Sequence, residues 1–170
     1  MNQEASPSLD TSWLRDLPHS RMVFPESLWD RAKYLFWRLY SPLHPKIRNV
    51  TTALGIVWHR GRQDFLLGKV SPNLTLKEFI TRLVARGYAN HFVAWKDEGE
   101  VVSLRYVENF KHQYHLRVFA DREVRAHYEY TPECHPIAHF MERQLENRRD
   151  EFLKMLGDTI VTPSSESFGF

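Results

Sequence analysis

The chain has 170 residues, of which 42% are hydrophobic and 26% are charged, and its formal net charge at pH 7 is +2. This length and composition fit one globular domain with a buried core and exclude disorder throughout. The single cysteine, Cys134, excludes an internal disulfide, and the N-terminus shows no secretory signal. We therefore expect a cytoplasmic protein without a membrane span, for which any membrane contact is peripheral.

The positive charge is concentrated in residues 31–70, which contain eight Lys or Arg residues and one acidic residue, Asp64. The remainder of the chain is net negative. A local excess of this kind can attract phosphates or acidic lipid headgroups. A solvated basic face is the commoner meaning of such a run.

Three regions are predicted along the chain. Residues 1–24 show no clear hydrophobic period and predict a weakly ordered N-terminal arm. Residues 25–158 predict a single α+β domain, because no linker composition or internal repeat divides them. Residues 159–170 are rich in serine and predict a frayed C-terminal tail.

The first predicted helix spans 27–40, after a proline that a first helical turn tolerates. Apolar residues recur at helical spacing, and Pro42 and Pro45 are expected to end the helix. Aromatic and basic side chains lie beside one another on it: Trp29, Tyr34, Trp37 and Tyr40 with Arg31, Lys33 and Arg38. This composition is typical of a helix that docks on a membrane surface or a protein partner, although a buried helix explains it as well.

A β-hairpin and a second helix are predicted next. The runs 54–59 and 65–70 are rich in strand-forming residues and flank Gly61, which suits a tight turn. Thr75 and Glu78 form a capping box that begins the second helix, and Gly87 is expected to end it in the left-handed conformation.

Four strands should then form a meander, at about 89–96, 100–107, 112–120 and 124–130. A long final helix is predicted from Thr131 to the closing Gly157. The expected fold is therefore α+β: a four-stranded antiparallel β-meander, extended by the preceding hairpin, with helices packed mainly on one face.

Side-chain alternation divides the meander into two faces, because a one-residue slip would turn the apolar set of a strand to the wrong side. The core face should carry Phe92, Ala94, Val102, Leu104, Leu116, Val118, Ala120, Val124, Ala126 and Tyr128. The other face should carry three cross-strand rows: His91, Arg105, His115 and Glu129; Val93, Ser103, Arg117 and His127; Trp95, Val101, Phe119 and Arg125.

This polar face suggests a binding module for an anionic ligand, either nucleic acid or a phosphorylated small molecule. Arginine offers a planar fork for phosphate or carboxylate, and aromatic rings can stack on bases. The candidate ligand-binding residues are His91, Trp95, Arg105, Arg117, Phe119 and Arg125. The same pattern also describes the solvated side of a half-buried sheet, but its apolar members suggest a cover: the first helix, the N-terminal arm or a ligand.

Two alternative functions are considered. One is a hydrolase or lyase in which His115, oriented by Glu129, is the general base and His127 is the acid. The other is a non-catalytic adaptor that docks on a membrane surface or a protein through helix 27–40.

Signals for a metal or an activated cysteine are weaker. His135 and His139 are four residues apart, a spacing that suits metal ligands, but exposed histidines at a helix start are more common. Cys134 lies near the same helix start, yet no orienting group is visible and a spectator cysteine is the better interpretation. Phosphate-binding glycine loops are missing from the sequence. We therefore predict neither a metal nor a cofactor.

Overall fold

A computed structural model describes residues 10–20, 25, 27–55, 65–91, 94, 96–136, 139 and 145–162. Its helices are η1 (Ser12–Asp16), α1 (Leu28–Tyr40), α2 (His44–Ala53), α3 (Leu76–Ala85), α5 (Arg149–Leu156) and η2 (Gly157–Thr159). Its strands are β1 (Phe65–Val70), β2 (Ala89–Asn90), β3 (Glu100–Val107), β4 (His112–Phe119), β5 (Glu123–Tyr130) and β6 (Ile160–Val161).

The six strands form one antiparallel sheet in the order β2-β3-β4-β5-β1-β6, which confirms the predicted α+β class. The hairpin prediction was wrong in part. β1 pairs with β5 and β6, and Leu54 and Gly55 form the turn after α2 rather than the start of a strand. The rest of the run 54–59 lies outside the described residues. Distant segments therefore supply both neighbours of β1, a pairing that local sequence patterns do not encode.

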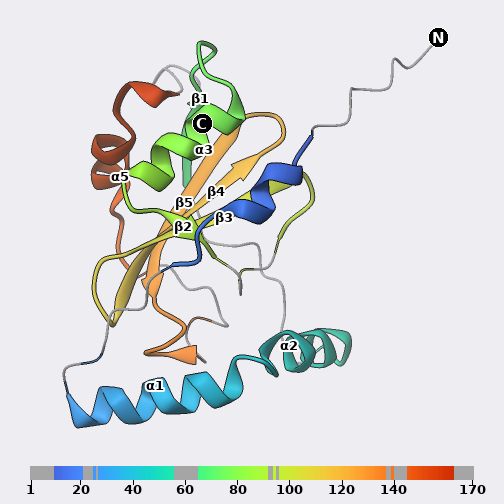
Figure 1. Ribbon diagram of the computed structural model, residues 1–170, viewed down its shortest axis with the longest axis vertical. Coiled ribbons are helices and arrows are strands. Elements are labelled where there is room, and N and C mark those ends of the chain that lie inside the picture. The colour runs from blue at the N-terminus through green and yellow to red at the C-terminus, as the bar shows by residue number, and fades with distance from the viewer. Residues whose placement is uncertain are drawn as a thin grey trace, which may run out of the picture.

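Helices α3 and α5 pack on the apolar face of the sheet (Figure 1). Their buried residues, including Phe79, Ile80 and Phe152, join the apolar residues of the central strands in one core. The capping box of α3 is confirmed, since the Glu78 amide donates to Thr75 Oγ1 and the Thr75 amide donates to Glu78 Oε2. Apolar burial thus places both helices on one side and leaves the polar side to other segments.

The first helix begins as predicted, after the N-cap Ser27, but a second helix follows it directly. Pro45 lies in the first turn of α2, where a missing amide hydrogen is tolerated, so it begins a helix instead of only ending one. α1 and α2 lie together at one end of the molecule, away from α3 and α5 (Figure 1).

The register between β3 and β4 is the predicted one, with Arg105 opposite His115 and Ser103 opposite Arg117. The register between β4 and β5 differs by two residues, so His127 rather than Glu129 lies opposite His115. The reason is the turn, which begins one residue earlier than predicted.

Arg122 adopts the left-handed conformation of that turn, with φ of 74°. Its amide donates to the Phe119 carbonyl, and Ala120, predicted in the core, is exposed in the turn. A shift of two residues preserves the alternation of faces, so the predicted polar face remains polar.

The strand predicted at 89–96 is also shorter than expected. β2 contains only Ala89 and Asn90, and Ala89 rather than His91 lies opposite Arg105. Phe92, Val93 and Trp95 lie outside the described residues.

The predicted long final helix is divided. Residues 132–134 form a turn, residues 145–148 are not helical, and α5 covers Arg149–Leu156 with Gly157 as its C-cap. The next residues continue the fold: Thr159 is buried, and β6 pairs with β1, where a frayed tail was expected. No helix within the described ranges is long and apolar enough to cross a membrane.

The pairing of β6 with β1 depends on Gly68, which lies at a bulge of β1 with φ of 153°. A Cβ atom there would lie 2.9 Å from the carbonyl carbon of Val161 and closer still to its oxygen. We expect Gly68→Ala to lower the free energy of unfolding by about 1–3 kcal/mol, because backbone would have to move. Urea unfolding measures this loss.

Gly99→Ala is the matched control. Gly99 has φ of 75° but no atom within 4 Å of its would-be Cβ, so only the conformational penalty applies. Equal losses in both variants would contradict the close approach of β6.

Candidate metal centre

The polar face of the sheet is buried. Its residues on β3, β4 and β5 are each no more than 1% exposed: Ser103, Arg105, Gln113, His115, Arg117, His127 and Glu129. Side chains from outside the sheet contact them, including Ser20 of the N-terminal segment and Glu133 and His139 of the segment after β5. The solvated-face alternative is therefore wrong, and each polar group here needs a partner within the protein.

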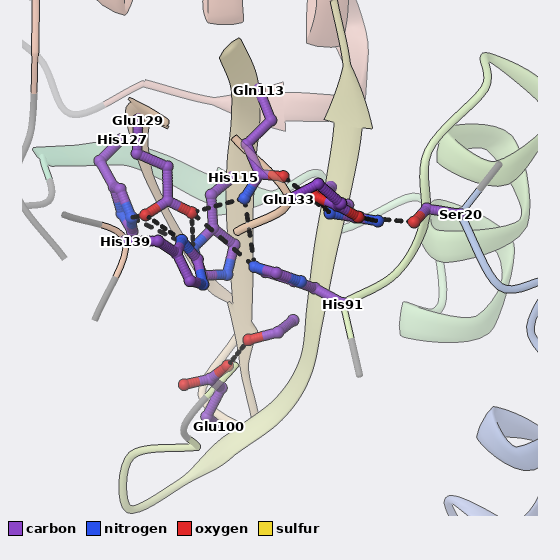
Figure 2. A network of polar contacts seen from close by, with 11 residues as sticks. Ser20, His91, Glu100, Gln113, His115, His127, Glu129, Glu133 and His139 are labelled. Atoms are coloured by element: carbon purple, nitrogen blue, oxygen red, sulfur yellow. Dashed lines mark hydrogen bonds and ion pairs between the residues drawn. The ribbon is translucent and has the colours of Figure 1, made fainter. Parts of the chain in front are cut away.

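The carboxylate of Glu129 lies at the centre of this face (Figure 2). Its Oε1 atom is 3.2 Å from His115 Nδ1 and 3.8 Å from His91 Nε2. Its Oε2 atom is 3.2 Å from His127 Nε2 and 3.1 Å from His139 Nδ1. We call these five residues the histidine–glutamate centre.

The sheet positions most of this centre. His115 and His127 lie opposite each other on β4 and β5, and their ring nitrogens Nδ1 and Nε2 are 3.1 Å apart. Glu129 follows two residues after His127 and therefore points to the same face. His91 follows β2 and His139 follows the turns after β5, so the two edges of the group come from separate segments.

Gln113 links the centre to its surroundings. It lies opposite Glu129 in the β4–β5 register and donates from Nε2 to Glu129 Oε1 at 2.7 Å. The same nitrogen is 3.2 Å from His91 Nε2, and Gln113 Oε1 accepts from Arg105 Nη1 at 3.1 Å. The carboxylate is thus held in place by a hydrogen bond as well as by the imidazoles around it.

Electrostatics favour an ionised carboxylate beside a neutral imidazole. Burial would raise the pKa of Glu129, but the imidazoles of His139 and His127 hold it well below its usual value. Burial lowers the pKa of His91 well below that of a free histidine. Ionised Glu129 and neutral His91 are thus in the forms that bind metal ions. The effect of His139 and His127 on Glu129 is that of positively charged imidazoles, whose charge a bound cation would replace.

The spacing of these atoms also suits a metal. Two triads, His91–Glu129–His139 and His115–His127–Glu129, each bring ligand atoms within 4.8 Å of one another. Bonds of about 2.0–2.1 Å to zinc place neighbouring ligand atoms roughly 2.8–3.4 Å apart, from octahedral to tetrahedral geometry. The contacts of 3.1 and 3.2 Å around Glu129 fall in that range. The His91 contact, at 3.8 Å, is longer than that range.

Several buried atoms of the centre have no hydrogen-bond partner among the described residues, including His91 Nδ1, His127 Nδ1 and Glu129 Oε2. Two ring nitrogens, His127 Nε2 and His139 Nδ1, lie 3.2 and 3.1 Å from Glu129 Oε2. A buried carboxylate oxygen in this state is costly unless a charge compensates it. A bound cation would supply that charge.

The two buried arginines of the polar face already have carboxylate partners. Arg105 forms a two-bond pair with Glu133, with Nη2 2.7 Å from Oε1 and Nη1 3.1 Å from Oε2, and its Nε donates to Ser20. Arg117 donates to Glu100 from Nε and Nη2 at 3.0 and 2.7 Å. An anion would have to displace these carboxylates to bind either guanidinium.

A bulge brings Glu100 to Arg117. Alternation would place Glu100 on the core face with Val102, but the register shifts between these two residues. Glu100 is therefore buried on the polar side, where it also accepts a hydrogen bond from Ser103. Val101 belongs to the core, contrary to its predicted place in the third row.

The remaining candidate ligand residues lie apart from the centre. The Arg125 side chain is 43% exposed and pairs with Glu123. The guanidinium carbons of Arg125 and Arg117 lie 5.0 and 5.1 Å from the ring centroid of buried Phe119. Trp95 lies outside the described residues. The structure thus groups His91, His115, His127 and Glu129, and separates them from the Phe119–Arg125 edge.

Sequence reasoning missed Glu100, Gln113 and Glu133 and assigned His139 to the wrong pair. His139 lies at Glu129, whereas the ring of His135 lies tilted against that of Tyr130, with centroids 4.5 Å apart. Strand alternation could have found Gln113, since it shares the parity of His115. Burial raises the pKa of Cys134, which is the opposite of an activated thiol.

No protein-family model matches the chain, and no match was found among curated proteins or solved structures. Inference about function therefore rests on the chemistry of the site.

The Arg105–Glu133 pair predicts a large stability effect. We expect Glu133→Ala to lower the free energy of unfolding by about 3–5 kcal/mol, because it leaves a buried guanidinium without its partner. Denaturant unfolding measures this loss. Glu123→Ala, which removes the half-exposed partner of Arg125, should change stability by at most about 1 kcal/mol. A small loss in Glu133→Ala would mean that water reaches Arg105.

Proposed function

We propose that this protein binds a divalent transition metal ion in the histidine–glutamate centre. The observation that carries the proposal is the convergence of four imidazole nitrogens on one buried carboxylate, at distances of 3.1 to 3.8 Å. Histidine and carboxylate are the common protein ligands of zinc and of other first-row ions.

Charge compensation supports a cation at this position. Of the buried glutamates among the described residues, Glu100 pairs with Arg117 and Glu133 pairs with Arg105. Among the described residues, the partners of Glu129 are histidines and Gln113. It is therefore the buried glutamate on this face without a permanent positive partner, which a metal ion would provide.

The donor set favours a catalytic over a structural ion. Structural zinc sites commonly use cysteine, whereas catalytic sites use histidine and carboxylate and keep a position open for water or substrate. Cys134 is not among the grouped residues. We therefore refine the hydrolase or lyase alternative: His115, His127 and Glu129 would hold the ion rather than act as acid and base, and the chemistry that the ion would supply is that of a Lewis acid.

Anion binding stays a prediction within this proposal. Arg105 and Arg117 are buried and paired with carboxylates, so attraction of an anionic substrate would depend on Arg125 beside Phe119. A screen of oligonucleotides and sugar phosphates against the metal-loaded protein, with Arg125→Ala as the variant, tests this part separately.

Metal binding is tested by titration calorimetry on chelator-treated protein with Zn²⁺ and by the visible spectrum after Co²⁺ addition. We expect saturable binding by the wild type and at least a tenfold loss of affinity in His127→Ala, since about 1.4 kcal/mol of lost ligand energy suffices for that factor. His112→Ala is the control, because His112 stacks on Tyr128 and Tyr130 away from the centre. Equal affinity in both variants would refute the site.

Gln113 should act on the ion through Glu129. We expect Gln113→Leu to weaken Zn²⁺ affinity by about 10- to 100-fold, the usual effect of removing a group that orients a metal ligand. The titration is paired with circular dichroism of the metal-free variant to establish that it is folded. Unchanged affinity in a folded variant would show that Glu129 does not need this hydrogen bond to bind metal.

A further inference from the structure

A large apolar surface is exposed on the first two helices. It consists of large hydrophobic residues of α1, α2 and the segments that join and follow them: Leu28, Trp29, Leu35, Phe36, Leu39, Leu43, Ile47, Val50 and Leu54. We call it the α1–α2 surface. Exposure is highest on α1, where Leu28 is 82% and Trp29 and Leu39 are each 71% exposed, and lowest at Ile47, which is 39% exposed. Large apolar side chains exposed in such number on neighbouring helices are typical of an interaction site.

Helix α1 is amphipathic, but its apolar stripe points away from the domain. Leu28, Leu35 and Leu39 recur at spacings of seven and four residues and are exposed together. The opposite side carries Trp37, which is fully buried and packs near Tyr40 and His44. A surface helix normally turns its apolar stripe to the core, so this reversal indicates that another apolar phase covers the stripe.

The charge of the α1–α2 surface indicates what kind of partner covers it. From 28 to 54 the chain has five basic residues and one acidic residue, Asp30. Arg31, Arg38 and Lys46 are exposed beside the apolar residues. A second copy of the chain would bring two such basic surfaces together, which is repulsive. An anionic surface is complementary to them.

We propose that the α1–α2 surface lies on anionic lipid membranes, with its apolar residues in the headgroup boundary and its basic residues at lipid phosphates. Exposed Trp and Phe beside Arg and Lys are typical of helices that lie in the membrane interface. With 13 and 10 residues, α1 and α2 are shorter than the roughly 20 residues of a spanning helix. The surface therefore supports peripheral attachment, independently of the metal centre.

Co-sedimentation of the full chain with vesicles tests the proposal. The probes are vesicles of phosphatidylcholine with about one third phosphatidylglycerol, and vesicles of phosphatidylcholine alone. We expect binding to the anionic vesicles that falls at least tenfold without phosphatidylglycerol or in high salt, because screening weakens the basic contacts. Absence of binding to anionic vesicles at low salt would overturn the proposal.

Two variants separate the apolar and the charged contributions. Leu39→Glu and Arg38→Glu should each lose binding, whereas Val161→Glu, at an exposed apolar residue of β6 outside the surface, should bind as the wild type does. Circular dichroism checks that all three are folded. Retained binding by folded Leu39→Glu would overturn the proposal, as would a dimer in sedimentation that this variant dissociates, since the occupant would then be a second copy.

Discussion

The structure depends on compensation of charge beneath the polar face of the sheet. Strand alternation turns Arg105, Arg117 and Glu129 to the same side, and that side is buried. Buried charges are tolerated only when they are paired and hydrogen-bonded. Glu133 from the turn after β5 and Glu100 from a bulge in β3 meet this need for the arginines. The irregular parts of the fold thus occur where a charge requires a partner.

The same need for a charge partner applies to Glu129 in the histidine–glutamate centre. Glu129 receives hydrogen-bonding support from Gln113 but no arginine or lysine among the described residues. An imidazole can be protonated to balance it, or a metal ion can take that place with several imidazoles as ligands. The second arrangement uses two ring nitrogens with Glu129 in either triad and needs the histidines neutral, which burial favours for His91.

Apolar surface is used in two opposite ways in this molecule. α3 and α5 bury their apolar faces against the sheet and complete the core. α1 buries Trp37 but exposes the stripe that includes Leu35 and Leu39. The catalytic proposal and the membrane proposal therefore rest on different parts of the chain, and a variant of one part leaves the other testable.

The sequence by itself determined the α+β class, the capped helix after Thr75 and the placement of Arg105, His115, Arg117, His127 and Glu129 on one face, because these depend on local propensity and on alternation with a period of two. Only the tertiary structure decided the neighbours of β1, the turn that brings His127 opposite His115, and the arrival of His139 at Glu129. These depend on contacts between distant segments and on one-residue choices in turns. Neither kind of contact produces a periodic pattern in the sequence. Some residues of the centre could therefore be predicted, but not the full set or its suitability for binding a metal ion.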